Sequence, residues 1–118
     1  MKLYADPITV NCRKVMAGLD FLGAPYERVH IDFFKSEQKS PEYLAINPNA
    51  TLPALVDGDL VLYETAAILL LLVDTHPQAG LAPAVGTAER AMFYKWLIWL
   101  SNSVQAMMPH YFYSDRMV

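Results

Sequence analysis

The first third of the chain shows hydrophobic patterns typical of two strands with a helix between them. A short apolar run at 2–4 predicts a strand, and the alternation over 26–31 predicts another. Between them, apolar residues recur every three or four positions over 11–22, which predicts an amphipathic helix that Gly23 ends. Because the return is short, this strand–helix–strand order predicts a parallel, right-handed unit.

The middle of the chain predicts a different pairing. A short helix is expected over 40–46, with a serine cap and a proline in its first turn. The β-rich runs 53–56 and 60–63 are separated by Asp57-Gly58-Asp59, which suits a tight hairpin turn. The second half of the sheet should therefore be antiparallel. The helix expected over 64–76 is apolar nearly all round, which is typical of a packed element.

The composition changes at Pro77. Prolines and glycines punctuate the following segment, as in a linker. Thr87 is then expected to cap a helix that carries large apolar side chains toward Met107, until Pro109 interrupts it. These features predict a first domain at 1–77, a linker at 78–86 and a further helical segment at 87–118.

Composition excludes several classes of protein. The chain has 118 residues, 54% of them hydrophobic, and a net charge of −3, so we expect neither disorder nor a nucleic-acid partner. The longest apolar run, 66–73, is too short to cross a bilayer, so no membrane partner is expected. A single cysteine, Cys12, leaves no internal disulfide. Asp6-Pro7 interrupts the apolar start that an export signal needs, so a cytoplasmic location is expected.

Two segments carry a resemblance to a known family. The stretch 46–55, which reads INPNATLPAL, is followed by Glu64-Thr65 at a helix start, and together they resemble the signature of cytosolic glutathione S-transferases. The segment 9–15 is similar to the serine-type active-site turn of that family. The resemblance implies a thioredoxin-like α/β domain of order βαβ-α-ββα, with a mixed four-stranded sheet, followed by the start of an all-α domain.

The resemblance also implies how glutathione, as co-substrate, would bind. The backbone of Leu52, before a cis Pro53, would pair with the cysteinyl part like an added strand. The helix start at Glu64-Thr65 would take the γ-glutamyl carboxylate, with Thr65 also capping the helix. Gln38 and Lys39 match loop positions that reach the glycyl carboxylate. The implied glutathione-binding residues are Gln38, Lys39, Thr51, Leu52, Pro53, Glu64 and Thr65, and no metal is expected.

Thr9 is the candidate catalytic residue, and Asn11 is its neighbour in the same role. A hydroxyl that donates to sulfur, helped by the positive end of a helix, would hold the glutathione thiol as thiolate. On local sequence alone, both residues are equally well explained as helix caps. Cys12 is interpreted as a packed thiol, with a monothiol oxidoreductase as the weaker alternative.

The chain departs from the family pattern in ways that change the expected function. Ala50 replaces the motif glycine, and Thr65 replaces serine, which suggests low affinity for glutathione. In the family a larger helical domain forms most of the pocket for a hydrophobic electrophile, and here only its first helix is expected. The predicted function is a glutathione transferase for a small electrophile. The alternative is a non-catalytic binding or regulatory module, truncated or assembled with a partner. A homodimer is expected through helices 64–76 and 88–107.

Overall fold

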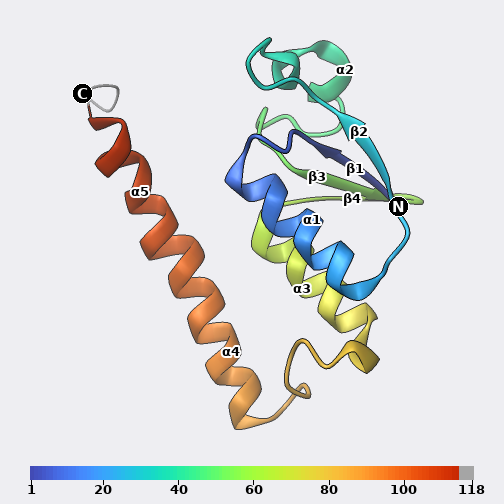
Figure 1. Cartoon of the computed structure of the whole chain (residues 1–118), viewed down its shortest axis with the longest axis vertical. Coiled ribbons are helices and arrows are strands. Elements are labelled where there is room, and N and C mark those ends of the chain that lie inside the picture. The colour runs from blue at the N-terminus through green and yellow to red at the C-terminus, as the bar shows by residue number, and fades with distance from the viewer. Residues whose placement is uncertain (115–118) are drawn as a thin grey trace. The chain divides into compact units, whose positions relative to one another are not determined.

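The computed structural model describes residues 1–114, and the chain divides into two compact units after His76 (Figure 1). The first unit contains, in order, β1 (Lys2–Ala5), α1 (Val10–Leu22), β2 (Glu27–His30), the short 3-10 turn η1 (Glu37–Lys39), α2 (Pro41–Leu44), β3 (Ala54–Asp57), β4 (Leu60–Tyr63) and α3 (Thr65–Thr75). Helices α1 and α3 cover one face of the sheet, and α2 lies on the other (Figure 1).

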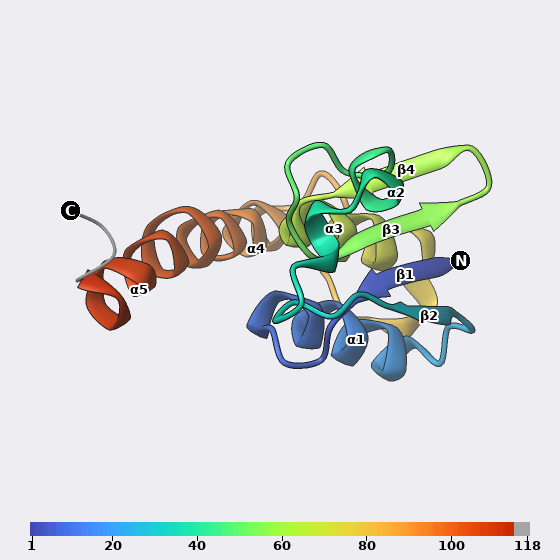
Figure 2. The ribbon, with the colours of Figure 1, turned by 90° about the horizontal axis from the view of Figure 1, so that it is seen from above.

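The sheet has the strand order β2-β1-β3-β4, with β1 between β2 and β3 (Figure 2). Strand β1 runs parallel to β2, and Tyr4 lies opposite Val29. Strand β3 runs antiparallel to both of its neighbours, so Leu55 lies opposite Leu3 on one side and Leu62 on the other. The predicted mixed four-stranded sheet and thioredoxin-like arrangement are thus confirmed.

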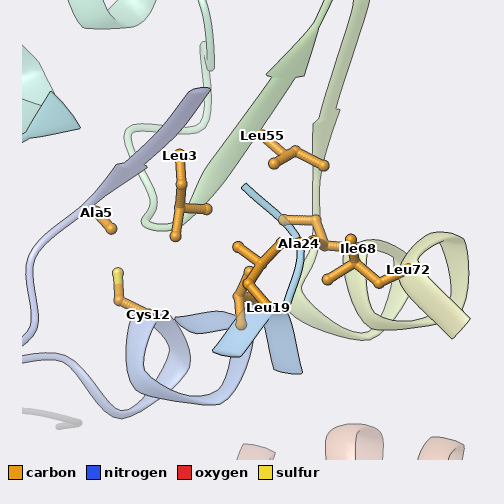
Figure 3. Close-up of a cluster of buried hydrophobic side chains, with 9 residues drawn as sticks. Leu3, Ala5, Cys12, Leu19, Ala24, Leu55, Ile68 and Leu72 are labelled. Atoms are coloured by element: carbon orange, nitrogen blue, oxygen red, sulfur yellow. The ribbon is translucent and has the colours of Figure 1, made fainter. Parts of the chain in front are cut away.

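The core of the first unit lies between the sheet and the two helices α1 and α3 (Figure 3). The helices approach closely at Gly18, where an added Cβ would lie 3.1 Å from Leu69 Cδ2. The lack of a side chain at Gly18 therefore lets α1 and α3 pack against each other. The buried hydrophobic cluster consists of Leu3, Ala5, Cys12, Val15, Leu19, Ala24, Leu55, Ile68 and Leu72.

The second unit is largely helical. After the 3-10 turn η2 (Pro77–Ala79), Thr87 caps α4 (Ala88–Ile98), which continues through the π-helical segment η3 (Trp99–Val104) into α5 (Gln105–Phe112). Pro109 lies within α5, so the expectation that it interrupts the helix is wrong. Proline removes only its own N–H from the helical ladder. The ladder resumes beyond it, because the Tyr113 N–H donates to the Pro109 carbonyl over 2.8 Å. Across residues 1–114, no helix has the length and apolar character needed to span a membrane.

Candidate functional site

The turn between β1 and α1 places Thr9 at the N-cap of α1. The Thr9 Oγ1 accepts a hydrogen bond from the Cys12 N–H over 3.3 Å and donates to the Asp6 carbonyl over 3.2 Å. The hydroxyl proton is therefore already used within the turn. Asn11 lies in the first turn of the helix, not at the cap, and its Oδ1 accepts from Lys14 Nζ over 3.4 Å.

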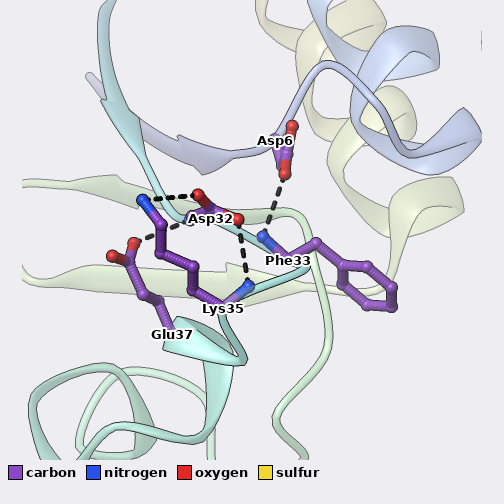
Figure 4. Close-up of polar contacts among 5 residues, drawn as sticks. All are labelled: Asp6, Asp32, Phe33, Lys35 and Glu37. Atoms are coloured by element: carbon purple, nitrogen blue, oxygen red, sulfur yellow. Dashed lines mark hydrogen bonds and ion pairs between the residues drawn. The ribbon is translucent and has the colours of Figure 1, made fainter.

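Asp6 organises this turn, although the sequence indicated only that Asp6-Pro7 interrupts an apolar start. Only 7% of the residue is exposed. Its Oδ1 accepts the Ile8 N–H over 3.0 Å, and its Oδ2 accepts the Phe33 N–H over 2.9 Å (Figure 4). These two hydrogen bonds hold the pKa of the Asp6 carboxyl below its usual range, and the bond from the Ile8 N–H has the larger effect. The bond to Ile8 is a local Asx turn that sequence can suggest, whereas the contact with Phe33 has no signal in the sequence.

Cys12 points into the core rather than toward the turn. Its side chain is fully buried in the hydrophobic cluster, and this burial raises the pKa of the Cys12 thiol. A reactive thiol must be accessible and acidic. The oxidoreductase alternative is therefore wrong, and the interpretation of Cys12 as a packed thiol is confirmed.

Side chains from α2 and from the loop that follows α2 hold the segment before β3 in place. The Leu52–Pro53 peptide is cis, as expected. The carbonyl of Thr51 accepts two hydrogen bonds, from the Tyr43 hydroxyl over 2.6 Å and from Asn47 Nδ2 over 2.9 Å. Tyr43 and Asn47 are 2% and 0% exposed, so both bonds are shielded from water. This arrangement positions the backbone of Thr51 and Leu52.

Ala50, at the motif position usually taken by glycine, has a φ of +53°. This is the left-handed region of backbone space, where a Cβ crowds the backbone and which glycine occupies without that penalty. The conformation explains why the family pattern has glycine there, and it marks the alanine as a costly departure.

The start of α3 differs in detail from the expectation. Glu64, not Thr65, holds the N-cap position, and its side chain makes no capping bond to the first turn of α3. Its backbone has φ +79° and ψ 112°, a sparsely populated conformation for a residue with a side chain. The prediction that Thr65 caps the helix is wrong, because Thr65 is already the first helical residue and its side chain lies beyond the capping position.

These segments meet at a cleft of about 130 Å³ in the first unit. Residues from α1, the segment before β3 and the start of α3 line it together: Asn11, Thr51, Leu52, Pro53, Glu64 and Thr65. The lining residues carry a carboxylate, an amide and two hydroxyls beside the backbone of Leu52, and this set suits a small zwitterionic ligand with peptide groups.

The three other predicted site residues lie outside the lining of this cleft. Thr9 lies two residues before Asn11, at the N-cap of α1. Gln38 and Lys39 lie in η1, where Lys39 is exposed and Gln38 is only 6% exposed. The Gln38 Oε1 is buried and accepts no hydrogen bond from residues 1–114.

Comparison with known proteins places the chain in a family. Residues 3–80 match the family model of the glutathione S-transferase N-terminal domain. A probable glutathione S-transferase GSTF2 from Oryza sativa subsp. japonica is 48% identical over 68 residues, which cover 58% of this chain and 32% of that protein. A zeta-class glutathione S-transferase from Euphorbia esula is 35% identical over 107 residues, covering 91% of this chain and 47% of that protein.

A solved structure gives the same picture. The glutathione transferase homologue from Sulfitobacter, determined with bound glutathione, has a TM-score of 0.85 and 33% identity, covering 99% of this chain and 56% of that one. The chain thus spans about a third to a half of the length of these curated relatives. On this evidence the chain belongs to the glutathione S-transferase family, and its residues 3–80 correspond to the N-terminal domain of that family.

Proposed function

We propose that the first unit binds glutathione and holds its thiol as thiolate for transfer to a small hydrophobic electrophile. The observation that carries this proposal is the cleft itself. Asn11, Leu52 and Thr65 come from distant parts of the chain, were implicated by the resemblance, and line one cleft. The Sulfitobacter homologue, whose structure contains glutathione, further supports the proposal.

In this proposal each part of glutathione, from the γ-glutamyl end to the glycyl end, has its own contacts with the first unit. The γ-glutamyl carboxylate lies at the N-terminus of α3, where backbone N–H groups and the helix dipole favour an anion. The Glu64 carboxylate meets the γ-glutamyl ammonium. The backbone of Leu52 pairs with the cysteinyl unit. Gln38 and Lys39, on η1, take the glycyl carboxylate.

The thiol end lies toward the start of α1. An amide N–H from Asn11 and the positive end of the helix stabilise a sulfur anion, which lowers the pKa of the bound thiol. Thr9 joins them only when its hydroxyl turns away from the Asp6 carbonyl, to which it donates over 3.2 Å. The thiol proton passes to solvent, and the thiolate sulfur then forms a bond to the electrophilic carbon, which releases its leaving group as an anion to solvent.

That hydrogen bond of Thr9 favours a second candidate function, a module that binds glutathione without turnover. A hydroxyl whose proton is held by a backbone carbonyl contributes nothing to thiolate stabilisation. The two candidates share the cleft and differ only in what Thr9 and Asn11 do to the thiol.

Calorimetric titration with glutathione tests the binding, and no heat at millimolar ligand would refute both candidates. A conjugation assay on Thr9→Ala and Asn11→Ala then separates them. Thr87→Ala is a matched control, because Thr87 caps α4 with the same two bonds, accepting from the Arg90 N–H and donating to the Ala84 carbonyl. A loss of turnover in the Thr9 or Asn11 variant, with full turnover in the control, supports catalysis. Binding without measurable turnover in the unmodified chain supports the binding module.

We also propose that the chain self-associates. Large apolar side chains on α4, η3 and α5 are about half exposed or more, among them Trp96 at 51%, Leu100 at 51% and Met107 at 64%. Exposed apolar faces of this kind mark contact surfaces. Analytical ultracentrifugation should find a dimer, and Leu100→Glu should shift it toward monomer.

A further inference from the structure

Asp6 makes four hydrogen bonds at the point where two loops meet. Its backbone carbonyl accepts from the Thr9 N–H over 3.0 Å and from the Thr9 hydroxyl over 3.2 Å. Its carboxylate accepts one backbone N–H from each loop, that of Ile8 over 3.0 Å and that of Phe33 over 2.9 Å. One buried residue thus sets the orientation of Thr9 and ties the turn before α1 to a loop 27 positions away.

The loop that begins near Phe33 is bonded internally as far as η1 (Figure 4). The Asp32 N–H donates to Glu37 Oε2 over 2.7 Å, and the Glu37 N–H donates to the Asp32 carbonyl over 3.1 Å. The Asp32 carboxylate accepts the Lys35 N–H and pairs with Lys35 Nζ, each over 3.0 Å. Because these bonds connect the loop to the start of η1, we take the bond at Phe33 to position Gln38 and Lys39 as well.

The two hydrogen bonds to the Asp6 side chain require a carboxylate. Both groups that point at the Asp6 carboxylate are N–H donors, and an ionised carboxylate accepts with both oxygens. An asparagine of the same shape has one acceptor oxygen, and its NH₂ group would face a second donor. Hydrogen bonds to a charged acceptor are also stronger than neutral ones.

We propose that Asp6 is a positioning residue of the glutathione site, which holds the Thr9 turn and the loop ending in Gln38 and Lys39 at one fixed spacing. This inference rests on the proposed function, in which the thiol end of glutathione lies at the Thr9 turn and the glycyl end lies at Gln38 and Lys39. The γ-glutamyl end lies at the start of α3, a segment that these hydrogen bonds of Asp6 do not hold. Loss of the Asp6 carboxylate removes the bond to the Phe33 loop and keeps the two carbonyl bonds to Thr9, so it should weaken the recognition of glycine and leave the thiol and γ-glutamyl contacts in place.

Two ligands separate positioning from a general structural role. Glutathione and γ-glutamylcysteine, which lacks glycine, are titrated calorimetrically into the full chain and its Asp6→Asn variant. The variant should bind glutathione about tenfold more weakly, the size expected when a ligand loses one or two well-placed hydrogen bonds. Its affinity for γ-glutamylcysteine should change by less than about threefold, since that ligand makes no glycyl contact and the variant keeps the backbone carbonyl that holds Thr9. Asp59→Asn, which removes the same charge from the exposed β3–β4 turn, should bind both ligands like the unmodified chain.

The outcomes are distinct. If the unmodified chain binds no glutathione, the proposed function fails and the inference fails with it. If the unmodified chain binds and Asp6→Asn binds glutathione equally well, or loses both ligands to the same extent, the inference alone is overturned. Should Asp6→Asn not fold, Glu37→Ala decides by the same criterion. Glu37 is exposed, and its carboxylate closes the same loop through the Asp32 N–H, so its loss should also weaken glutathione selectively.

Discussion

Replacing Asn47 by alanine should lower the free energy of unfolding of the first unit by about 3 kcal/mol, because three hydrogen bonds end on this buried side chain. Its Nδ2 donates to the Thr51 carbonyl over 2.9 Å and to the Thr51 Oγ1 over 3.0 Å, and its Oδ1 accepts the Asn49 N–H over 3.0 Å. Each such bond contributes about 1 kcal/mol net.

Tyr43→Phe is the matched comparison. It removes one hydrogen bond to the same Thr51 carbonyl, of 2.6 Å, and should cost about 1 kcal/mol. In each variant the carbonyl keeps its other donor, so neither leaves that group without a partner. The two variants should therefore differ by about 2 kcal/mol, or about 30-fold in the unfolding constant.

Urea titration measures this difference, with amide hydrogen exchange followed in peptides from residues 1–76. Tryptophan fluorescence would not serve, because Trp96 and Trp99 both lie in the second unit. An unchanged urea dependence would show that only stability has changed. If Asn47→Ala costs no more than Tyr43→Phe, the reasoning that each buried bond adds to the stability of this segment is refuted.

Three further outcomes follow from the first unit. Ala50→Gly should raise the free energy of unfolding by about 1 kcal/mol, since it relieves a φ of +53°, and an unmoved urea midpoint would contradict this. Cys12 should resist a thiol reagent in the native chain and react once urea unfolds it, because its side chain is fully buried; native labelling would contradict that. Burial raises the pKa of Tyr43 to about 12 from an ordinary 10.0, so its contribution to stability is complete below pH 10.0 and falls as pH rises toward 12. Tyr43→Phe should flatten this alkaline decline in unfolding curves measured at several pH values.

Much of the fold was predictable because it depends on local patterns. The alternation in the strands, the three-and-four spacing in α1 and the hairpin turn at Gly58 are properties of neighbouring residues. The prediction that Pro109 ends the helix was wrong because proline breaks helices only on average. In α5 the helix continues past Pro109 with the loss of one N–H donor.

The candidate site was predictable only through the family motif. The two segments of resemblance, the motif at 46–55 with Glu64-Thr65 and the turn at 9–15, together named all of the residues that line the cleft, although their roles remain proposals. Two features had no local signal. Asp6 meets Phe33 across 27 positions of sequence, a contact that exists only once the loops are folded. The N-cap position fell to Glu64 rather than Thr65 because the cap is set by backbone angles and not by the better capping side chain.

The close approach at Gly18 connects the packing of the core with the shape of the cleft. Helix α1 presents Asn11 to one wall of the cleft, and α3 presents Thr65 to another, so the separation of the two helices sets how wide the cleft can be. A methyl group at position 18 would lie 3.1 Å from Leu69 Cδ2, so the Leu69 side chain on α3 would have to yield by a few tenths of an ångström. Under the proposed function, the fit of glutathione would then depend on a residue that lies outside the lining of the cleft.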